Sequence, residues 1–235
     1  MKAITKMSLV YVLFIFGMTA YSQNCNFYFP LEENKGVVYE NYDNAGNLQG
    51  SQEMKVKKVT SHSDHVEASL SSKQYDSNNH LIHQGEFGVK CIGNKIVIDI
   101  KSILDPNMIE GFEGMEILME NDDIVIPADL STGQQLPDAR VYMKVSAGGM
   151  LVTELTFTLK NRNVLSKEKV NVPAGNFDTF KISYDFILET KAMGMESKMV
   201  FKNIEYHSAN IGMIKSQTYD DQDKIISSTL LSKIL

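Results

Sequence analysis

The sequence predicts an all-β protein, in which one large antiparallel sheet curves into an open barrel or a sandwich and carries one short helix. Apolar and polar residues alternate with a period of two along most of the chain, as in strands that have one buried and one wet face. Similar turn segments recur between these stretches, and one stretch alone has helical spacing. The series of hairpins favours an up-and-down strand order.

The three clearest predicted strands lie at residues 140–145, 151–160 and 179–189, where the alternation runs without interruption. Shorter segments with the same pattern are expected to form further strands. These segments are residues 37–42, 54–60, 66–72, 87–91, 96–101, 170–172, 199–204, 213–219 and 225–231.

A short repeat connects some of these strands, at residues 42–48, 75–81 and 219–225. Each copy begins Tyr-Asp and returns to an apolar residue, so the Asp is expected to cap its own turn while Asn or Gly takes a left-handed backbone. Three β-hairpins are therefore predicted. The third copy has Asp223 where a glycine is expected, which leaves its turn type open. Residues 147–149 and 174–176 mark two more turns.

One segment departs from the β pattern. Asp105 and Pro106 form a typical helix start, and apolar residues then recur at helical spacing. Gly111 and Gly114 each cost about 1 kcal/mol of helix propensity, so the helix must be short or irregular. A helix over residues 106–119 is predicted, packed across an opening of the sheet.

The first 22 residues have the layout of a secretory signal peptide. Lys2 and Lys6 precede an apolar run over residues 7–18, and the small residues Ala20 and Ser22 precede Gln23. Export and cleavage before Gln23 are predicted, to the periplasm or outside the cell. An uncleaved anchor is the alternative, but the run is short of the about 20 residues that a membrane span needs. No transmembrane span is predicted in the mature chain.

Residues 23–235 are expected to form a single all-β domain. No linker rich in Pro, Gly or Ser divides them. The nearest candidate boundary is the crossing segment at residues 126–137, so the alternative is two β subdomains that meet near residues 127–137. The chain carries a formal net charge of −6, which argues against nucleic acid as a partner.

Two cysteines, Cys25 and Cys91, are expected to form a disulfide in an oxidising compartment. A catalytic or metal-binding cysteine is the alternative, but no His or second Cys lies near either residue in the sequence. Lipidation of Cys25 is a further alternative, which the preceding Gln23 and Asn24 fit poorly because a lipoprotein signal has a small residue there.

The common catalytic motifs are absent from the sequence, which contains no G-x-S-x-G, P-loop, H-E-x-x-H or C-x-x-C. His62 and His65 are three residues apart, as are His80 and His83, and on a strand that spacing sends side chains to opposite faces. No metal site and no cofactor are predicted. The acidic residues at 220–223 lack the oxygens and glycine of a calcium loop, so they are interpreted as a solvated hairpin end.

Methionines form the one unusual pattern, since they gather on the expected helix and on the strand after residue 193. Methionine adapts to varied apolar shapes, so an adaptable apolar pocket is a hypothesis, with irregular core filling as its alternative. The candidate ligand-pocket residues are Met108, Phe112, Met115, Met119, Phe157, Phe180, Tyr184, Phe186, Met193, Met195 and Met199.

Several motifs together resemble the TapB family of secreted bacterial proteins, a domain of unknown function. They are the segments at 25–30, 42–46, 89–91, 126–139, 170–177 and 211–220, of which the sharpest is Val-Asn-Val-Pro-Ala-Gly-Asn-Phe at 170–177. The resemblance spans nearly all of the mature chain and consists of turn and strand-end residues. It implies an all-β extracytoplasmic domain and no particular activity.

The sequence therefore favours a non-catalytic extracytoplasmic envelope protein that binds an apolar ligand or a protein partner. Concave apolar sites are the usual form of small-molecule pockets, although the apolar face could equally be closed core. Two alternatives stay open: a structural or assembly partner in the cell envelope, which would expose an apolar patch, and a hydrolase whose residues meet only in space, marked by a histidine beside a carboxylate and a serine.

Overall fold

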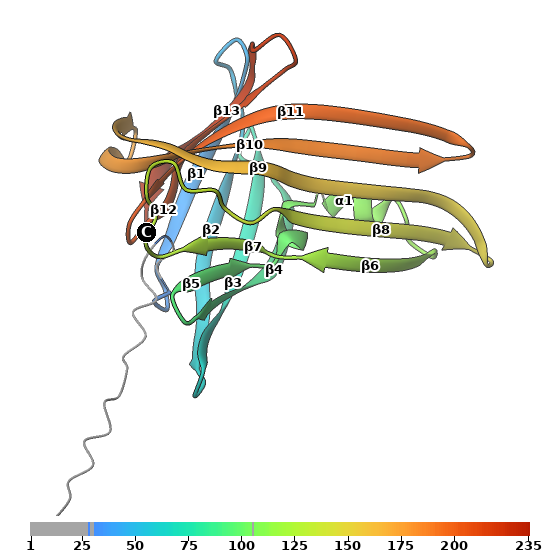
Figure 1. Cartoon of the computed structure of the whole chain (residues 1–235), viewed down its shortest axis with the longest axis horizontal. Coiled ribbons are helices and arrows are strands. Elements are labelled where there is room, and N and C mark those ends of the chain that lie inside the picture. The colour runs from blue at the N-terminus through green and yellow to red at the C-terminus, as the bar shows by residue number, and fades with distance from the viewer. Residues whose placement is uncertain (1–27, 29–30, 105) are drawn as a thin grey trace, which may run out of the picture.

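The computed structural model describes residues 28, 31–104 and 106–235 and confirms the all-β fold class. All thirteen strands belong to one antiparallel sheet that curves almost into a barrel (Figure 1). The strands are β1 Gly36–Asp43, β2 Leu48–Ser61, β3 His65–Asp76, β4 Leu81–Ile92, β5 Lys95–Ile98, β6 Glu116–Asp122, β7 Ile124–Pro127, β8 Ala139–Ala147, β9 Met150–Val172, β10 Gly175–Ala192, β11 Met195–Ser208, β12 Gly212–Tyr219 and β13 Ile225–Ile234.

Most neighbours in the sheet are also neighbours in sequence, as the hairpin series predicts. The order is β6-β8-β9-β10-β11-β12-β13-β1-β2-β3-β4-β5-β7. Strands β6 and β7 stand at its two ends, yet Asp123 alone separates them in the chain. The same stretch of backbone therefore pairs first with β8 and then with β5, and it closes the sheet through the chain itself.

The three predicted hairpins are confirmed, and their turns share one mechanism. In each, the Oδ1 atom of the aspartate accepts hydrogen bonds of 2.8–3.0 Å from the main-chain N–H groups two and four residues later. A left-handed residue completes each turn. These residues are Gly46, Asn79 and Asp223, with φ of 82°, 64° and 58°.

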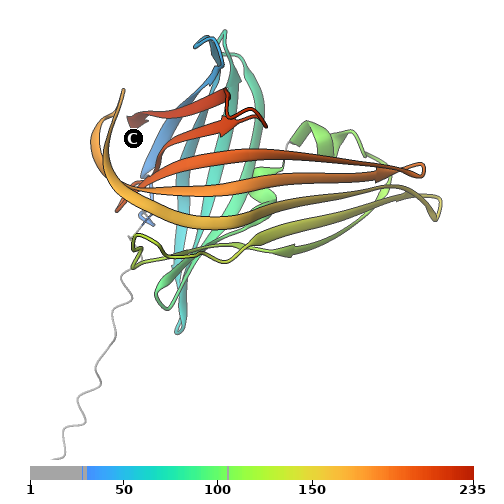
Figure 2. The ribbon, with the colours of Figure 1, turned by 45° about the horizontal axis from the view of Figure 1, so that its top comes forward.

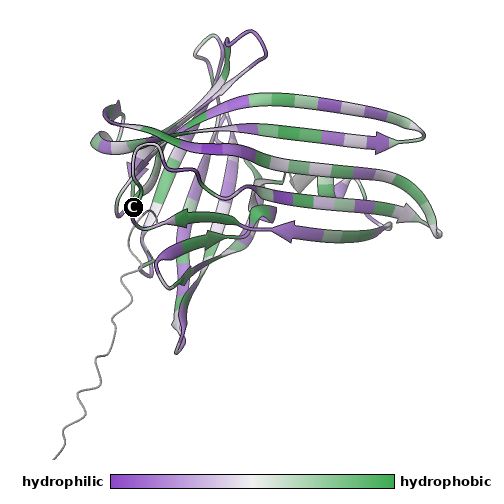
Figure 3. Ribbon diagram, in the orientation of Figure 1, coloured by the Kyte–Doolittle hydropathy of each residue, from purple (hydrophilic) through white to green (hydrophobic). Residues whose placement is uncertain are grey.

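The segments predicted as strands at 151–160 and 170–172 are parts of one long strand, β9. Strands β8 to β11 run along the longest axis of the molecule, and their hairpin ends project beyond the rest of the sheet (Figures 1 and 2). Apolar and polar residues alternate along these strands (Figure 3). The inward residues of β8 and β9, from Val141 to Leu159, form an apolar cluster with Ile100 and Leu104.

The predicted helix over 106–119 is wrong beyond residue 110. Helix α1 comprises Pro106–Glu110 and follows a 3-10 turn, η1, at Ile100–Ile103. After a turn at 111–114, residues 116–122 form strand β6, which pairs with β8. Ile117 and Met119 are half-buried and alternate with the exposed residues Glu116, Leu118 and Glu120, so the apolar spacing that fits a helix also fits a strand.

Cys91 is fully buried among apolar side chains on β4. No cysteine in the described part of the chain is free. Cys25 lies outside the described residues, as do the signal segment and its cleavage site, so the Cys25–Cys91 disulfide stays a prediction.

Candidate functional site

The curved sheet encloses a cavity of about 550 Å³. This volume lies within the about 300–1,000 Å³ that small-molecule sites usually have. Its wall is mostly apolar, with a few polar side chains. The lining residues are Tyr28, Tyr39, Met54, Phe87, Ile98, Ser102, Ile124, Ile126, Leu159, Arg162, Tyr184, Phe186, Phe201, Asn203, Glu205, His207, Met213, Thr218 and Ile226.

A β-bulge in β9 turns Arg162 into this cavity. Lys160 pairs with Asp185 and Asn163 with Ser183, so β9 has one residue more than β10 at this point. Asn161 takes a left-handed backbone there, with φ of 55°. Bulges commonly re-aim side chains beside functional sites. Arg162 is 4% exposed, and its Nη1 donates to the main-chain carbonyls of Val125 at 3.1 Å and Pro137 at 2.7 Å.

Glu205 is the centre of a group of polar side chains that line the cavity. The Tyr184 hydroxyl on β10 donates to its Oε1 at 2.6 Å, and His207 Nε2 lies 2.8 Å from its Oε2. Glu205 and His207 lie on the same face of β11 because they are two residues apart. We use "polar floor" below for these three residues and Arg162.

The polar floor favours an ionised Glu205. Burial raises the pKa of this carboxyl, but the hydrogen bonds from His207 and Tyr184 and the charge of Arg162 outweigh burial, so the pKa lies below its usual value. Burial and the nearby Glu205 charge raise the pKa of Tyr184 well above its usual value. The same two causes raise the pKa of Tyr39, whose hydroxyl donates to the Met213 carbonyl at 2.9 Å.

The predicted pocket residues divide between the cavity, the core and the surface. Tyr184 and Phe186 line the cavity. Phe180 packs edge-on against Tyr28 at a ring distance of 6.2 Å. Another group packs into the apolar cluster of β8 and β9, next to the cavity. This group consists of Met108, Phe112, Met119 and Phe157.

The remaining predicted pocket residues are exposed and do not line this cavity. Met193 and Met195 are 90% and 72% exposed at the β10–β11 turn, and Met115 and Met199 are also exposed. Met193, Met195 and Met199 belong to the β10–β11 hairpin, whose end projects with that of β8–β9 beyond the rest of the sheet (Figure 1), and Met115 lies in the turn before β6. Met150 and Leu151, at the β8–β9 turn, are exposed at the same end, since Ala192 at the end of β10 pairs directly with Thr153 near the start of β9.

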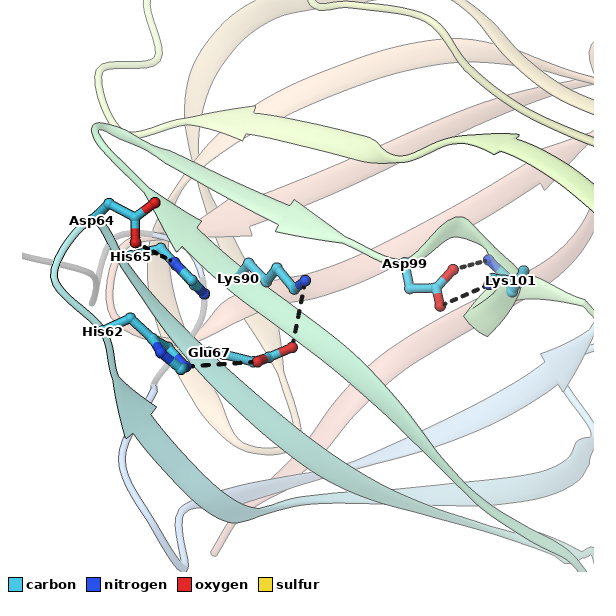
Figure 4. Close-up of polar contacts among 7 residues, drawn as sticks. All are labelled: His62, Asp64, His65, Glu67, Lys90, Asp99 and Lys101. Atoms are coloured by element: carbon cyan, nitrogen blue, oxygen red, sulfur yellow. Dashed lines mark hydrogen bonds and ion pairs between the residues drawn. The ribbon is translucent and has the colours of Figure 1, made fainter.

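His62 and His65 lie together, which corrects the expectation that their side chains point to opposite faces. They flank the β2–β3 turn, not one strand, and their rings stack at 4.3 Å (Figure 4). With Glu67 they offer three ligand atoms within 4.8 Å of one another, and Asp64 orients His65 Nδ1 at 2.8 Å. A divalent metal accepts such ligands, but Lys90 Nζ already lies 3.5 Å from Glu67, and the group is solvent-accessible.

Sequence reasoning did not identify Arg162, Glu205 or His207 as cavity residues. One signal was present: the polar residues Asn203, Glu205 and His207 alternate with the apolar residues Ile204 and Tyr206. The position of Arg162 was not predictable, because the bulge at Asn161 shifts the alternation of β9 by one residue.

This geometry defines an all-β protein built on one antiparallel sheet that curves around an amphipathic cavity. The chain belongs to the DUF3108-like family, whose model matches residues 32–231. This supports the broader family, while the narrower resemblance to the TapB family stays a prediction.

Two solved structures share the fold. A predicted lipoprotein of Parabacteroides distasonis is 21% identical, with a TM-score of 0.72, and the match covers 91% of this chain and 100% of that one. A predicted exported protein of Bacteroides fragilis, described as having a YmcC-like fold, is 17% identical, with a TM-score of 0.70, and covers 90% and 100%. No curated protein matches. Within the described ranges, no helix has the length and apolar character to cross a membrane.

Proposed function

We propose that this chain is a non-catalytic extracytoplasmic envelope protein that holds an apolar small molecule inside its curved sheet. The observation that carries the proposal is the cavity of about 550 Å³, which has an apolar wall and a small polar floor. Mostly apolar pockets with a few convergent polar groups are the usual form of ligand sites. Predicted export agrees with the descriptions of the two structural relatives as exported or lipoprotein.

A neutral fluorescent probe, N-phenyl-1-naphthylamine, tests this function. We expect saturable binding with increased fluorescence in the purified mature protein, and lipid in an organic extract of protein isolated from the periplasm. Ile226→Trp fills the cavity and should abolish probe binding, because Ile226 lines it. Leu151→Trp is the matched control, since Leu151 is exposed at a distant turn. Absence of both probe binding and extracted lipid contradicts the proposal.

One observation favours the alternative of an assembly partner. Met150, Leu151, Met193 and Met195 expose apolar side chains at neighbouring hairpin ends, and contiguous exposed apolar patches commonly mark interaction sites. Serine substitutions at Met193 and Met195 separate the two functions. Under the assembly function they remove a complex that cross-linking captures with the unaltered protein, whereas under the binding function they leave probe affinity unchanged.

The described residues show only part of the arrangement that a hydrolase requires. His207 lies beside Glu205, and Ser102 lines the same cavity. A serine nucleophile needs a hydrogen bond to the histidine that takes its proton. Nδ1 of His207 has no such bond within the described part of the chain. The geometry therefore supports binding better than catalysis.

A further inference from the structure

The polar floor has one unsatisfied atom and one charge without a contacting counter-ion. His207 is 7% exposed, and its Nδ1 is buried without a hydrogen-bond partner among the described residues. Arg162 is buried, and its described hydrogen bonds both end on neutral carbonyls. A buried polar atom without a partner is costly, whereas the nearby Glu205 charge offsets the charge of Arg162. Both side chains line the cavity.

Glu205, which contacts Nε2 of His207, determines whether Nδ1 of His207 must accept or donate a hydrogen bond. An ionised carboxylate only accepts hydrogen bonds, so the 2.8 Å contact with Glu205 places the hydrogen of a neutral imidazole on Nε2. Nδ1 is then a lone-pair acceptor, and it needs a donor from whatever occupies the cavity. A protonated imidazole would instead donate from Nδ1 and would need an anion.

We propose that the cavity binds a long-chain carboxylic acid, with its acid group at His207 and its chain along the apolar wall, and that each molecule binds together with one proton. This inference rests on the proposed function and names its ligand class. The bound acid either keeps its proton and donates O–H to Nδ1, or gives it to Nδ1 and accepts N–H in return. In both cases the complex holds one proton more than the free carboxylate and neutral imidazole.

Charge balance in the cavity supports the accompanying proton. Arg162 and Glu205 carry opposite charges, so a carboxylate that entered alone would leave a net negative charge in an apolar enclosure, which is unfavourable. The other titratable groups lining the cavity are Tyr28 near the N-terminal end, Tyr39 on β1 and Tyr184 on β10. Burial raises the pKa of all three, so they stay neutral at pH 8. Nδ1 of His207, which is buried without a hydrogen-bond partner among the described residues, is therefore the place assigned to the shared proton.

Calorimetry on the mature protein at pH 8 provides the test. Hexadecanoic acid, its methyl ester and hexadecanol are titrated in two buffers of different ionisation enthalpy, which reports the protons taken up per ligand. We expect one proton per acid and none per ester or alcohol. Because only the acid takes up a proton, its affinity relative to that of the ester should rise about tenfold when the pH is lowered from 8 to 7.

A substitution isolates the role of His207. His207→Gln retains an amide donor for Glu205 but removes the titratable nitrogen, so we expect proton uptake to disappear and the acid affinity to fall about tenfold or more, with ester affinity unchanged. His80→Gln is the matched control, because His80 lies at the exposed β3–β4 turn, and it should change neither quantity.

An acid-to-ester affinity ratio that does not change with pH, or acid binding without a proton, overturns the head-group inference while the proposed function stands. Failure of all three probes to bind contradicts the proposed function itself. If His207→Gln does not fold, the comparison of acid, ester and alcohol on the unaltered protein still decides the inference.

Discussion

Tyr184→Phe should lower the stability of the protein by removing one hydrogen bond from the polar floor. The hydroxyl donates to Glu205 at 2.6 Å, and His207 supplies the second contact of that carboxylate at 2.8 Å. Hydrogen bonds to charged groups contribute about 1.5–3 kcal/mol. We therefore expect the free energy of unfolding at pH 7 to fall by about 2 kcal/mol, which corresponds to roughly 4–8 °C in Tm for a domain of this size.

The pH dependence gives this prediction a second, signed component. The folded pKa of Glu205 lies below the usual 4.5, so its ionisation contributes stability that is present above pH 4.5 and is lost as pH falls through the folded pKa. Tyr184→Phe removes one cause of the low pKa. The loss of stability in the variant should be largest near neutral pH and should shrink as pH falls below 4.5.

Urea denaturation followed by circular dichroism between pH 3 and pH 8 measures both components. Tyr142→Phe is the matched control, since the Tyr142 hydroxyl donates to Glu154 at 2.7 Å on the wetter face of the sheet. Its effect should be much smaller because solvent replaces the lost partner. Equal losses in the two variants, or a loss below about 0.5 kcal/mol for Tyr184→Phe, would refute the assignment of a structural charge-assisted bond in the cavity.

Three further predictions concern the sheet and its covalent state. Gly50→Ala should lower the free energy of unfolding by about 2 kcal/mol, because a new Cβ would lie 2.3 Å from the Tyr75 carbonyl oxygen. Gly88→Ala is the control, since a Cβ at residue 88 would have nothing within 4 Å. Similar urea midpoints for the two variants would contradict the predicted clash at Gly50. Asp223→Gly should raise stability by about 0.5 kcal/mol, because relief of the left-handed backbone exceeds the added chain entropy; a lower urea midpoint would count against the turn assignment. Intact mass of the exported protein should show a chain beginning at Gln23 with two hydrogens missing, as a disulfide between Cys25 and Cys91 requires; a lipid adduct on Cys25 excludes that pairing.

Most of the fold prediction rested on the alternation of side chains, because a half-buried strand has apolar residues on one face and polar residues on the other, at alternate positions in the sequence. The turns at Asp43, Asp76 and Asp220 were predictable for a related reason: each aspartate bonds its own backbone locally. The segment after Glu110 was wrongly predicted as helical, because its apolar spacing fits either a helix or a strand. Only pairing with β8, a long-range contact, decides for a strand.

The site was less predictable than the sheet because it depends on interruptions of the pattern. The bulge at Asn161 sets the direction of Arg162, and nothing in a period-two pattern marks a bulge. The methionines near residue 193 fit a pocket by composition, yet the length of β10 and β11 carries them beyond it. Which part of a strand covers a cavity follows from strand length and curvature, which local patterns do not report.

The pairing of β1 with β13 has a consequence for the order of events during synthesis. Residues 37–43 bond to residues 227–234, so the central seam of the sheet cannot form until nearly the whole chain has left the ribosome. Contacts so distant in sequence fold slowly. A nascent chain of this protein would stay unfolded for longer than one with local contacts, which suits passage through a translocation channel that accepts only unfolded polypeptides.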